Sequence, residues 1–475
     1  MNIWPLRFRE LADGRVFLAD DAGTFFLSDR SFVDRYGEDR LTTRDRDFLL
    51  ANGHAFETES EPAYNSFAWR WSARQAKGGR LRYVILVPTL RCNLACTYCQ
   101  VSRAPETARG FDWTPEALAQ VLGYLEALSG SEIKIEFQGG EPLLRLDLLN
   151  AVRDFCRARF ARSEFVVCTN LQSIGPAELD FLSASDTYVS TSVDGVLSDH
   201  DRHRTQNPAL AKQFFENLGA VRRVAAGRIS ALPTIDLDQP PDLDALIRTY
   251  EDLGQNSIFL RPVNYQGFAR RRHPAARDVG RWNQFHENFV RKIIERNYQT
   301  GGNLGEYYLT LCLKRMLAPG HDGHVDLRNP GLLGDDYLVI DQDGVLYPTD
   351  EARMVSRIGL ADLSIGTVAH GVDHQRLAAL NGAAFNHLDP DCVHCPYQPF
   401  CGVDPVDDIS RYGRLDLPKH LTWFCGRHLA LFDLAARLLF SRDEMVQHSL
   451  RQWLDLPEIP IGLAPVHYDP TAPTR

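Results

Sequence analysis

Short apolar runs alternate with longer amphipathic stretches through the middle of the chain. The apolar and alternating runs predict strands at 83–88, 133–138, 164–169, 187–193, 228–235 and 256–262. The stretches between them have the helical period and predict helices near 114–128, 146–160, 176–184, 208–225 and 242–253. Strands that alternate with helices in this way are typical of a parallel α/β sheet or barrel. We therefore expect residues 82–300 to form an α/β barrel domain.

The segments on either side have different patterns. In residues 1–78, the apolar runs 15–19 and 24–28 flank Asp20-Asp21-Ala22-Gly23 and predict a β-hairpin, with helices near 30–36 and 43–52 after it. This segment is expected to be a small α+β unit. Residues 301–430 form a third region. A helix is predicted over 428–440, and its end falls in the last region, residues 431–475. The proline-rich tail, 457–475, is expected to be irregular or extended.

Composition narrows the class of protein. Hydrophobic residues make up 44% and charged residues 24% of the 475 positions, as in ordinary globular proteins. The net charge of −10 argues against a nucleic-acid partner. There is no apolar stretch of bilayer length and no signal-like N-terminus, so no membrane partner and a cytoplasmic location are expected. Ten cysteines then indicate metal ligands or core thiols, and Cys156, Cys168 and Cys312 are expected in the core.

Three cysteines directly after the first predicted strand carry the strongest chemical signal. Cys92, Cys96 and Cys99 have the spacing C-x3-C-x2-C. Three thiolates on a [4Fe–4S] cube leave one iron open to another ligand. The loop follows a strand, and the carboxyl ends of barrel strands are where active sites lie. A zinc knuckle is the alternative, but zinc sites usually pair two C-x2-C units or add histidines, and neither is close in sequence.

This motif, with Tyr98 before the third cysteine, resembles that of radical S-adenosylmethionine (SAM) enzymes. The resemblance implies a partial (β/α)6 barrel in which the open iron chelates SAM. Reduction of the cluster then cleaves SAM to a 5′-deoxyadenosyl radical. Gly139, Gly140 and Glu141 follow the second strand and resemble the loop that holds the amino group of SAM in this superfamily.

Further candidates for the SAM site lie at later strand ends. Thr169 and Asn170 end the third strand, and Ser192 ends the fourth. Ser192-x-Asp194-Gly195 with a following arginine resembles a pattern of the peptide- and sulfatase-maturing branch, in which the serine contacts the ribose and the arginine the carboxylate of SAM. Arg204 is the candidate, with Arg202 as the alternative. Ordinary polarity at the barrel rim would explain each of these residues equally well.

A second cysteine group lies near the C-terminus. Cys392, Cys395, Cys401 and Cys425 provide four thiolates, enough for one closed site, and their spacing alone allows zinc or iron. The pattern resembles the SPASM iron–sulfur domain of peptide-modifying radical SAM enzymes, which normally holds two auxiliary clusters. Pro405 and Thr349 stand where that family has cysteines of the first cluster. The resemblance therefore implies one auxiliary [4Fe–4S] cluster.

The residue after Thr349 is the candidate acid or base. Sulfatase-maturing relatives carry an aspartate there, and Asp350 could accept the proton released when a substrate radical is oxidised. A solvated turn formed by Asp350 and Glu351 is an equal alternative. The runs 87–92, 99–103 and 347–354 look most like the His-Xaa-Ser system radical SAM maturases. That resemblance implies a small ribosomally made precursor peptide as substrate and a flavodoxin or ferredoxin as reductant.

The expected reaction is an oxidative modification that forms a side-chain cross-link in the peptide. Two other outcomes use the same chemistry: oxidation of Cys or Ser to formylglycine, and epimerisation at an α-carbon, which needs a hydrogen donor and leaves the mass unchanged. A metal-bearing partner that binds peptide without turnover belongs to a different class. Residues 1–78 resemble the winged-helix peptide-recognition elements of such enzymes, but a plain structural extension of the barrel fits them equally well.

Overall fold

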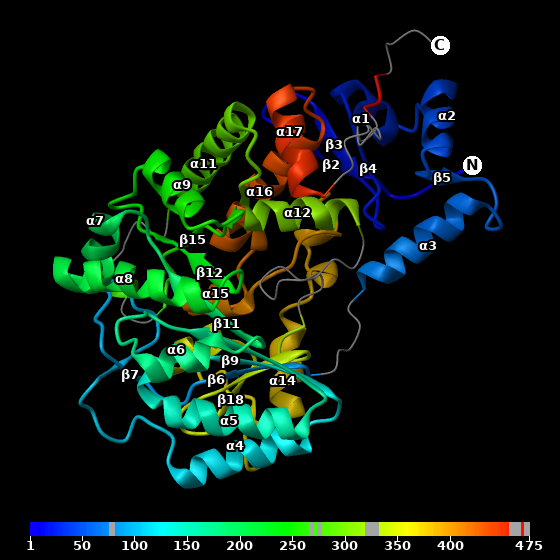
Figure 1. Ribbon diagram of the computed structural model, residues 1–475. Helices are drawn as coiled ribbons and strands as arrows, with labels where there is room; N and C mark the ends of the chain where they lie inside the picture. Colours follow the sequence, from blue (N-terminus) through cyan, green and yellow to red (C-terminus); the bar gives the residue numbers. More distant parts are fainter. Residues whose placement is uncertain (76–80, 267–268, 273–277, 319–331, 456–466, 470–475) are drawn as a thin grey trace.

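A seven-stranded sheet forms the centre of the molecule. A computed structural model describes residues 1–75, 81–266, 269–272, 278–318, 332–455 and 467–469 (Figure 1). The strand order is β12-β11-β10-β9-β6-β17-β18, and all neighbours are parallel except the β17–β18 hairpin. The strands are β6 (Tyr83–Leu86), β9 (Glu132–Phe137), β10 (Arg162–Cys168), β11 (Thr187–Ser192), β12 (Ile229–Leu232), β17 (Tyr337–Ile340) and β18 (Leu346–Tyr347).

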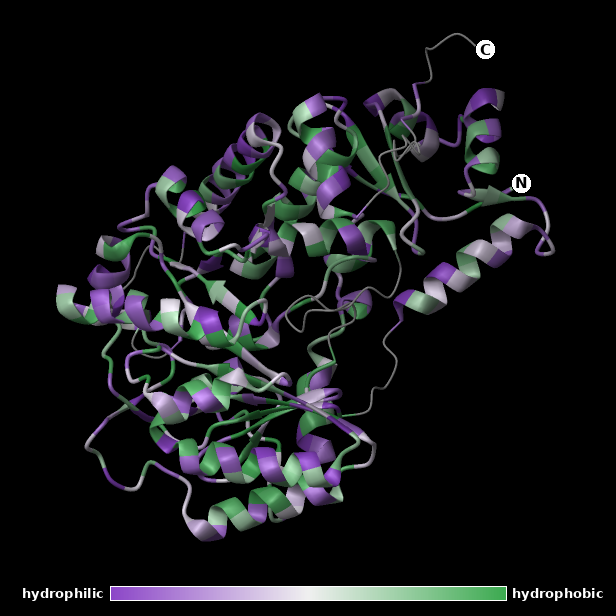
Figure 2. Ribbon diagram, viewed as in Figure 1, coloured by the Kyte–Doolittle hydropathy of each residue, from purple (hydrophilic) through white to green (hydrophobic). Residues whose placement is uncertain are grey.

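The helices between these strands confirm the predicted α/β alternation. They are α4 (Pro115–Ala127), α5 (Leu146–Arg159), α6 (Pro176–Ser183), α8 (Pro208–Val224) and α9 (Leu243–Asp252). Figure 2 shows green and purple positions alternating along α4 and α5, and their apolar positions, such as Val121 and Leu149, are buried. Thr114 caps α4, because its hydroxyl accepts a hydrogen bond from the backbone N–H of Ala117 (3.2 Å).

The fifth and sixth predicted strands differ from the expectation. Pro233, which has no N–H to donate, separates β12 from β13 (Thr234–Ile235). The sixth is divided into β14 (Ser257–Ile258) and β15 (Arg261–Pro262), and neither belongs to the main sheet. They pair instead with β16 (Gly305–Glu306) and with β13.

The place beside β6 is taken by β17, which comes from the region expected to follow the barrel. Leu338 of β17 is in register with Val84 of β6. Residues beyond 300 therefore complete the sheet, and the expected boundary at 300 does not separate the barrel from the third region.

The N-terminal segment contains the predicted hairpin and helices. Strands β3 (Val16–Ala19) and β4 (Phe25–Ser28) form the hairpin, which β2 (Arg7–Glu10) extends to three strands. The helices α1 (Arg30–Gly37), α2 (Thr43–Ala51) and α3 (Pro62–Arg74) follow. Buried Arg74 fastens this unit to the rest of the chain, since its guanidinium donates to the backbone oxygens of Ala22 (2.7 Å) and Arg315 (3.2 Å).

The C-terminal part is mainly helical. Its helices are α11 (Val279–Thr300), α12 (Tyr307–Leu317), α13 (Asp350–Arg357), α14 (His374–Gly382), α15 (Pro405–Tyr412), α16 (Trp423–Leu439) and α17 (Glu444–Trp453). The helix predicted over 428–440 thus begins earlier, at Trp423, and α17 was not predicted. Most of the tail lies outside the described residues. A search of the described helices for one long and apolar enough to cross a membrane finds none.

Candidate active site

One large cavity brings together residues from distant parts of the sequence. It has a volume of about 690 Å³, runs along one face of the main sheet and reaches the carboxyl ends of its strands. The predicted site residues that line it are Cys92, Cys96, Cys99, Gly139, Gly140, Thr169, Asn170, Ser192, Arg204 and Asp350. The parallel strands explain this convergence, because their carboxyl ends meet at one edge of the sheet.

The cysteine loop is bound to the neighbouring strand end. The backbone N–H of Leu94 lies 3.4 Å from the Cys92 sulfur, and the side-chain amide of Asn170 lies 3.6 Å from it. Burial raises the pKa of the Cys92 thiol to about 12 and that of Cys96 to about 11. Thiols in this setting deprotonate readily only when a cation such as cluster iron binds them. Three thiols at this spacing, all lining one cavity, match the ligand set of a [4Fe–4S] cluster with one open iron.

The two glycines allow two loops to touch. The N–H of Gly140 donates to the carbonyl of Thr89 (3.0 Å), and that of Glu141 donates to the carbonyl of Arg91 (2.8 Å). A Cβ at Gly139 would overlap the Thr89 oxygen, and one at Gly140 would overlap the Arg91 oxygen. The resemblance implies that this loop holds the amino group of SAM. The described contact is with the start of the cysteine loop, which they hold against the end of β9.

Glu141 is turned toward the protein. Its carboxylate accepts hydrogen bonds from the backbone N–H groups of Asn170 (2.7 Å) and Leu143 (3.1 Å). Burial raises the pKa of this carboxyl to about 7 in spite of those bonds. Unlike the two glycines, Glu141 is not among the residues that line the cavity. Its observed role is to join the glycine loop to the end of β10, and direct contact with the amine of SAM stays a prediction.

Asp194 connects the cysteine loop with Arg204. Its carboxylate accepts hydrogen bonds from the Tyr98 hydroxyl, the Arg204 guanidinium (2.8 Å) and the N–H of Thr234 (2.9 Å). Burial alone would raise the pKa of Asp194, but the charge and the hydrogen bond of Arg204, together with His200 and the N–H of Thr234, outweigh it and lower the pKa. Arg202 forms an ion pair with Asp199 instead (3.2 Å). Of the two candidate arginines, Arg204 is therefore the one in the cavity wall.

A cluster around Glu136 was missed by the sequence analysis. Its carboxylate accepts hydrogen bonds from the Tyr83 hydroxyl, the Gln138 amide (2.6 Å) and the Cys168 thiol (3.1 Å), and all four side chains line the cavity. The expectation that Cys168 is a core thiol is therefore wrong, whereas Cys156 and Cys312 are buried as expected. Burial, with a contribution from Glu136, raises the Cys168 pKa well above its usual value. The period-two pattern of β9 could have indicated that Glu136 shares a face with Lys134.

Asp350 is paired rather than solvated. It opens α13, accepts a hydrogen bond from Nε of the buried Arg353 (2.8 Å) and forms an ion pair with Nη2 of the same guanidinium (2.7 Å). Burial raises its pKa, partly offset by Arg353. The alternative of a solvated turn is wrong for Asp350, which is buried in the cavity wall. Thr349, in the place of a cysteine, caps α13 by accepting from the N–H of Ala352 (3.0 Å).

The four C-terminal cysteines surround a second cavity, of about 500 Å³. Cys392, Cys395, Cys401 and Cys425 all line it, and so does Arg9 of β2, whose guanidinium is paired with Asp433 (2.8 Å). Among the described residues, no three His, Cys, Asp or Glu side chains are placed to share a single metal ion. Four thiols are the number of protein ligands that one closed site needs. Pro405, which stands where the SPASM family has a cysteine, is the first residue of α15.

The sequence of this chain is similar to those of several known proteins. Residues 86–247 match the model of the radical SAM superfamily. An uncharacterized protein of Methanocaldococcus jannaschii is 29% identical over 118 residues, 24% of this chain and 40% of that protein. A GTP 3′,8-cyclase of Marinobacter nauticus is 30% identical over 145 residues, 30% of this chain and 42% of the cyclase. The chain thus spans about two fifths of the length of these curated relatives.

Solved structures match over a larger share of the chain. The structure of anSMEcpe with bound AdoMet (SAM) has a TM-score of 0.61 at 16% identity, covering 74% of this chain and 96% of that one. Streptococcus suis SuiB bound to the precursor peptide SuiA has a TM-score of 0.51 at 11% identity, covering 87% and 97%. At these identities the likeness shows the fold alone. Residues 86–247 thus match the radical SAM superfamily in sequence, and the chain shares the fold of these solved structures.

Proposed function

We propose that this chain oxidatively modifies a small ribosomally made peptide and forms a side-chain cross-link in it. One observation carries the proposal. The cavity that holds the cysteine triad also holds a buried carboxyl, Asp350, and the chain has a second, separate four-thiol site. A cross-link needs a place to start a radical, a group to accept a proton and an acceptor for one electron, and these sites could supply all three.

The residues of the first site would bind and orient SAM. Cys92, Cys96 and Cys99 would hold a [4Fe–4S] cluster, and Gly139 and Gly140 would lie next to the amino group of SAM. Reduced by a flavodoxin- or ferredoxin-type donor, the cluster and SAM together supply a carbon radical that removes a hydrogen atom from the substrate. The chain's task is to place the peptide carbon at that point and to exclude water.

Asp350 would take the proton of the second hydrogen. The cross-link forms one new bond between two side chains of the peptide, and two hydrogens leave. The first hydrogen leaves as an atom. The second leaves as a proton, which Asp350 accepts, and as an electron. The four-cysteine site would hold the acceptor of that electron as an auxiliary [4Fe–4S] cluster. A raised pKa makes Asp350 a better base than an ordinary aspartate once it is ionised.

Three observations support a peptide substrate. Structural neighbours of this chain were solved with peptides, SuiB with SuiA and anSMEcpe with Cp18Cys. In this chain the N-terminal unit reaches the second cysteine site through Phe8, Arg9 and Glu10. The sequence resemblance to the His-Xaa-Ser system maturases points to the same substrate class. The GTP 3′,8-cyclase matches each cover a third of this chain or less, so they bear on the SAM chemistry and leave the substrate open.

Replacing Asp350 with asparagine is expected to separate SAM cleavage from peptide modification. Asparagine retains an oxygen for Arg353 but cannot accept the proton, so the yield of modified peptide should fall by about 10²-fold while 5′-deoxyadenosine still forms. The measurement is the ratio of 5′-deoxyadenosine to modified peptide, by liquid chromatography and mass spectrometry. Asp343→Asn, at an exposed carboxylate that pairs with Arg357 (3.2 Å), is the matched control. Equal loss of both products, with an unchanged melting temperature, would contradict the role.

Epimerisation is the second candidate, and one residue favours it. An epimerase must return a hydrogen atom to the α-carbon from the opposite face. The Cys168 thiol lines the cavity, donates to Glu136 and keeps its proton at neutral pH because its pKa is raised. It is therefore a candidate hydrogen donor. Incorporation of one deuterium from D2O at an α-carbon, lost in Cys168→Ala, would identify this reaction.

A further inference from the structure

A loop between two of the C-terminal cysteines is held by arginines of the N-terminal unit. This loop, residues 396–400, joins the second and the third of the four cysteines. Arg7 of β2 donates a hydrogen bond to the side-chain oxygen of Gln398 (2.9 Å). Arg74, the last residue of α3, donates to the carbonyl of Pro399 (3.3 Å). Two cations from the first 75 residues thus bind the loop that connects these thiols.

Arg9 of β2 reaches the same site and has a carboxylate partner there. Its Nε and Nη2 atoms donate to the two carboxylate oxygens of Asp433 on α16 (2.8 and 2.9 Å). The hydroxyl of Tyr397, within the 396–400 loop, donates to the same carboxylate (2.7 Å). Of the ion pair, Arg9 lines the four-cysteine cavity and Asp433 does not. The pair is therefore fixed in place with its cation on the cavity wall.

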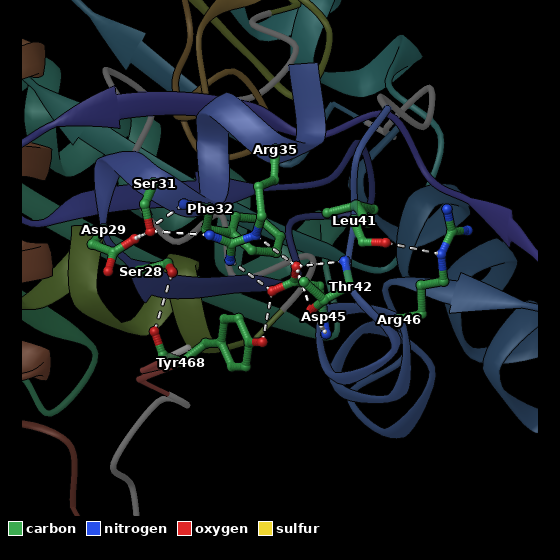
Figure 3. A network of polar contacts seen from close by, with 10 residues as sticks. All are labelled: Ser28, Asp29, Ser31, Phe32, Arg35, Leu41, Thr42, Asp45, Arg46 and Tyr468. Atoms are coloured by element: carbon green, nitrogen blue, oxygen red, sulfur yellow. Dashed lines mark hydrogen bonds and ion pairs between the residues drawn. The ribbon is translucent and has the colours of Figure 1, made fainter. Parts of the chain in front are cut away.

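The unit that presents these arginines has a packed interior of its own. Leu6, directly before β2, is buried in its small hydrophobic core. Figure 3 shows a polar network in the same unit, in which Asp45 accepts two hydrogen bonds from the guanidinium of Arg35, both at 2.8 Å, and one from the hydroxyl of Tyr468 (2.7 Å). Strand β2 is thus part of a folded scaffold, which fixes where its arginines lie.

The charges on β2 and α16 act on the thiols with a net positive effect. Burial raises the pKa of the Cys395 thiol, and a backbone hydrogen bond from Tyr397 and the charges of Arg9 and Arg7 oppose that rise. The charge of Asp433 adds to the rise, but by less than either arginine opposes it. A positive charge beside an iron–sulfur site favours the state with one more electron and so raises its reduction potential.

We propose that Arg9 raises the reduction potential of the group held by the four C-terminal cysteines, and that Asp433 fixes the guanidinium at the cavity wall and partly offsets its charge. This inference rests on the proposed function, in which that site takes up one electron when the peptide radical loses one. A higher potential favours this transfer. The N-terminal unit is then part of the electron-accepting site, although none of residues 1–75 is a cysteine.

The test removes one charge of the ion pair at a time. The full chain with Cys92, Cys96 and Cys99 replaced by alanine is reconstituted, so that the remaining iron belongs to the four-cysteine site. Its midpoint potential is measured by redox titration followed by electron paramagnetic resonance. Arg9→Met should lower the ratio of reduced to oxidised site about tenfold at a fixed potential, a shift of about 59 mV for one electron. Asp433→Asn should shift the midpoint potential upward.

The opposite signs separate an effect of charge from a loss of structure. Both substitutions break the same ion pair, so a loosened loop alone would not move the potential down in one variant and up in the other. Arg9→Met combined with Asp433→Asn should lie between the two single variants. Arg15→Met is the matched control, because it removes a cation of the same unit that pairs with Asp13 (2.6 Å) and does not line the cavity. It should leave the potential unchanged.

The outcomes distinguish this inference from the proposed function. Unshifted potentials in both single variants, or shifts of the same sign, with about four irons per chain, would overturn the role of Arg9 and leave the auxiliary cluster standing. A starting protein whose four-cysteine site gives no iron signal would overturn both. The readout is a potential, so it does not depend on whether any peptide is modified.

Discussion

Replacing Cys92, Cys96 and Cys99 together with alanine is expected to reduce SAM cleavage to background. All three thiols line the large cavity, and three thiolates on a [4Fe–4S] cluster leave one iron open for SAM. After anaerobic reconstitution the intact chain should bind about eight irons, and the variant about four. Iron content and 5′-deoxyadenosine formation are measured on the same samples.

The matched variant removes the other cysteine set. With Cys392, Cys395, Cys401 and Cys425 replaced by alanine, the chain should again hold about four irons but should still cleave SAM. The two cavities share no cysteine, and this explains why the losses should be independent. Full iron content in the first variant would contradict the assignment of the triad. Zinc in place of iron in the intact protein, at the second site, would contradict the auxiliary cluster.

Replacing Gly140 with alanine is expected to weaken SAM binding severely through a single methyl group. The added Cβ would overlap the carbonyl oxygen of Arg91, just before Cys92, so one of the two backbone segments must shift. Overpacking of this kind costs about 1–3 kcal/mol. If the protein with SAM bound carries this cost and the free protein does not, SAM affinity should fall by about 5- to 150-fold. Isothermal titration calorimetry on the reconstituted protein measures it.

Gly123 provides the control for this substitution. It lies within α4, where a Cβ would meet no atom within 4 Å. Gly123→Ala should therefore leave SAM affinity unchanged and raise stability slightly, because alanine is the better helix former. If Gly140→Ala bound SAM as tightly as Gly123→Ala, the close contact between the glycine loop and the cysteine loop would not matter for the site.

The parts of the site that were predictable are local in sequence. The cysteine spacing, the Gly-Gly-Glu turn and the polar strand ends each lie within a few residues, and the α/β alternation then places them at one edge of a sheet. Partners of single side chains could not be inferred in this way. Glu136 was visible only as one polar position in an alternating strand, and its contact with Cys168 depends on how β9 and β10 are aligned.

Pairing between strands that are far apart in the sequence was the main source of error in the predicted fold. The run 337–340 is short and apolar, and nothing in its sequence indicates that it lies beside β6, some 250 positions earlier. The predicted sixth strand was lost from the sheet because its pairing partners are β13 and β16. Likewise, a proline-rich composition predicted an irregular tail, and only the three-dimensional arrangement shows Tyr468 within the N-terminal core.

The measurement that tests the central claim most directly is the mass of candidate precursor peptides, taken from short reading frames near this gene, after co-expression with the intact enzyme and with the triple-alanine variant of the triad. Loss of two hydrogens with the intact enzyme alone is the predicted result, and fragment ions should place the change between two side chains. An unchanged mass, with SAM cleavage confirmed in the same cells, would contradict cross-linking and make epimerisation, with Cys168 as hydrogen donor, the better account.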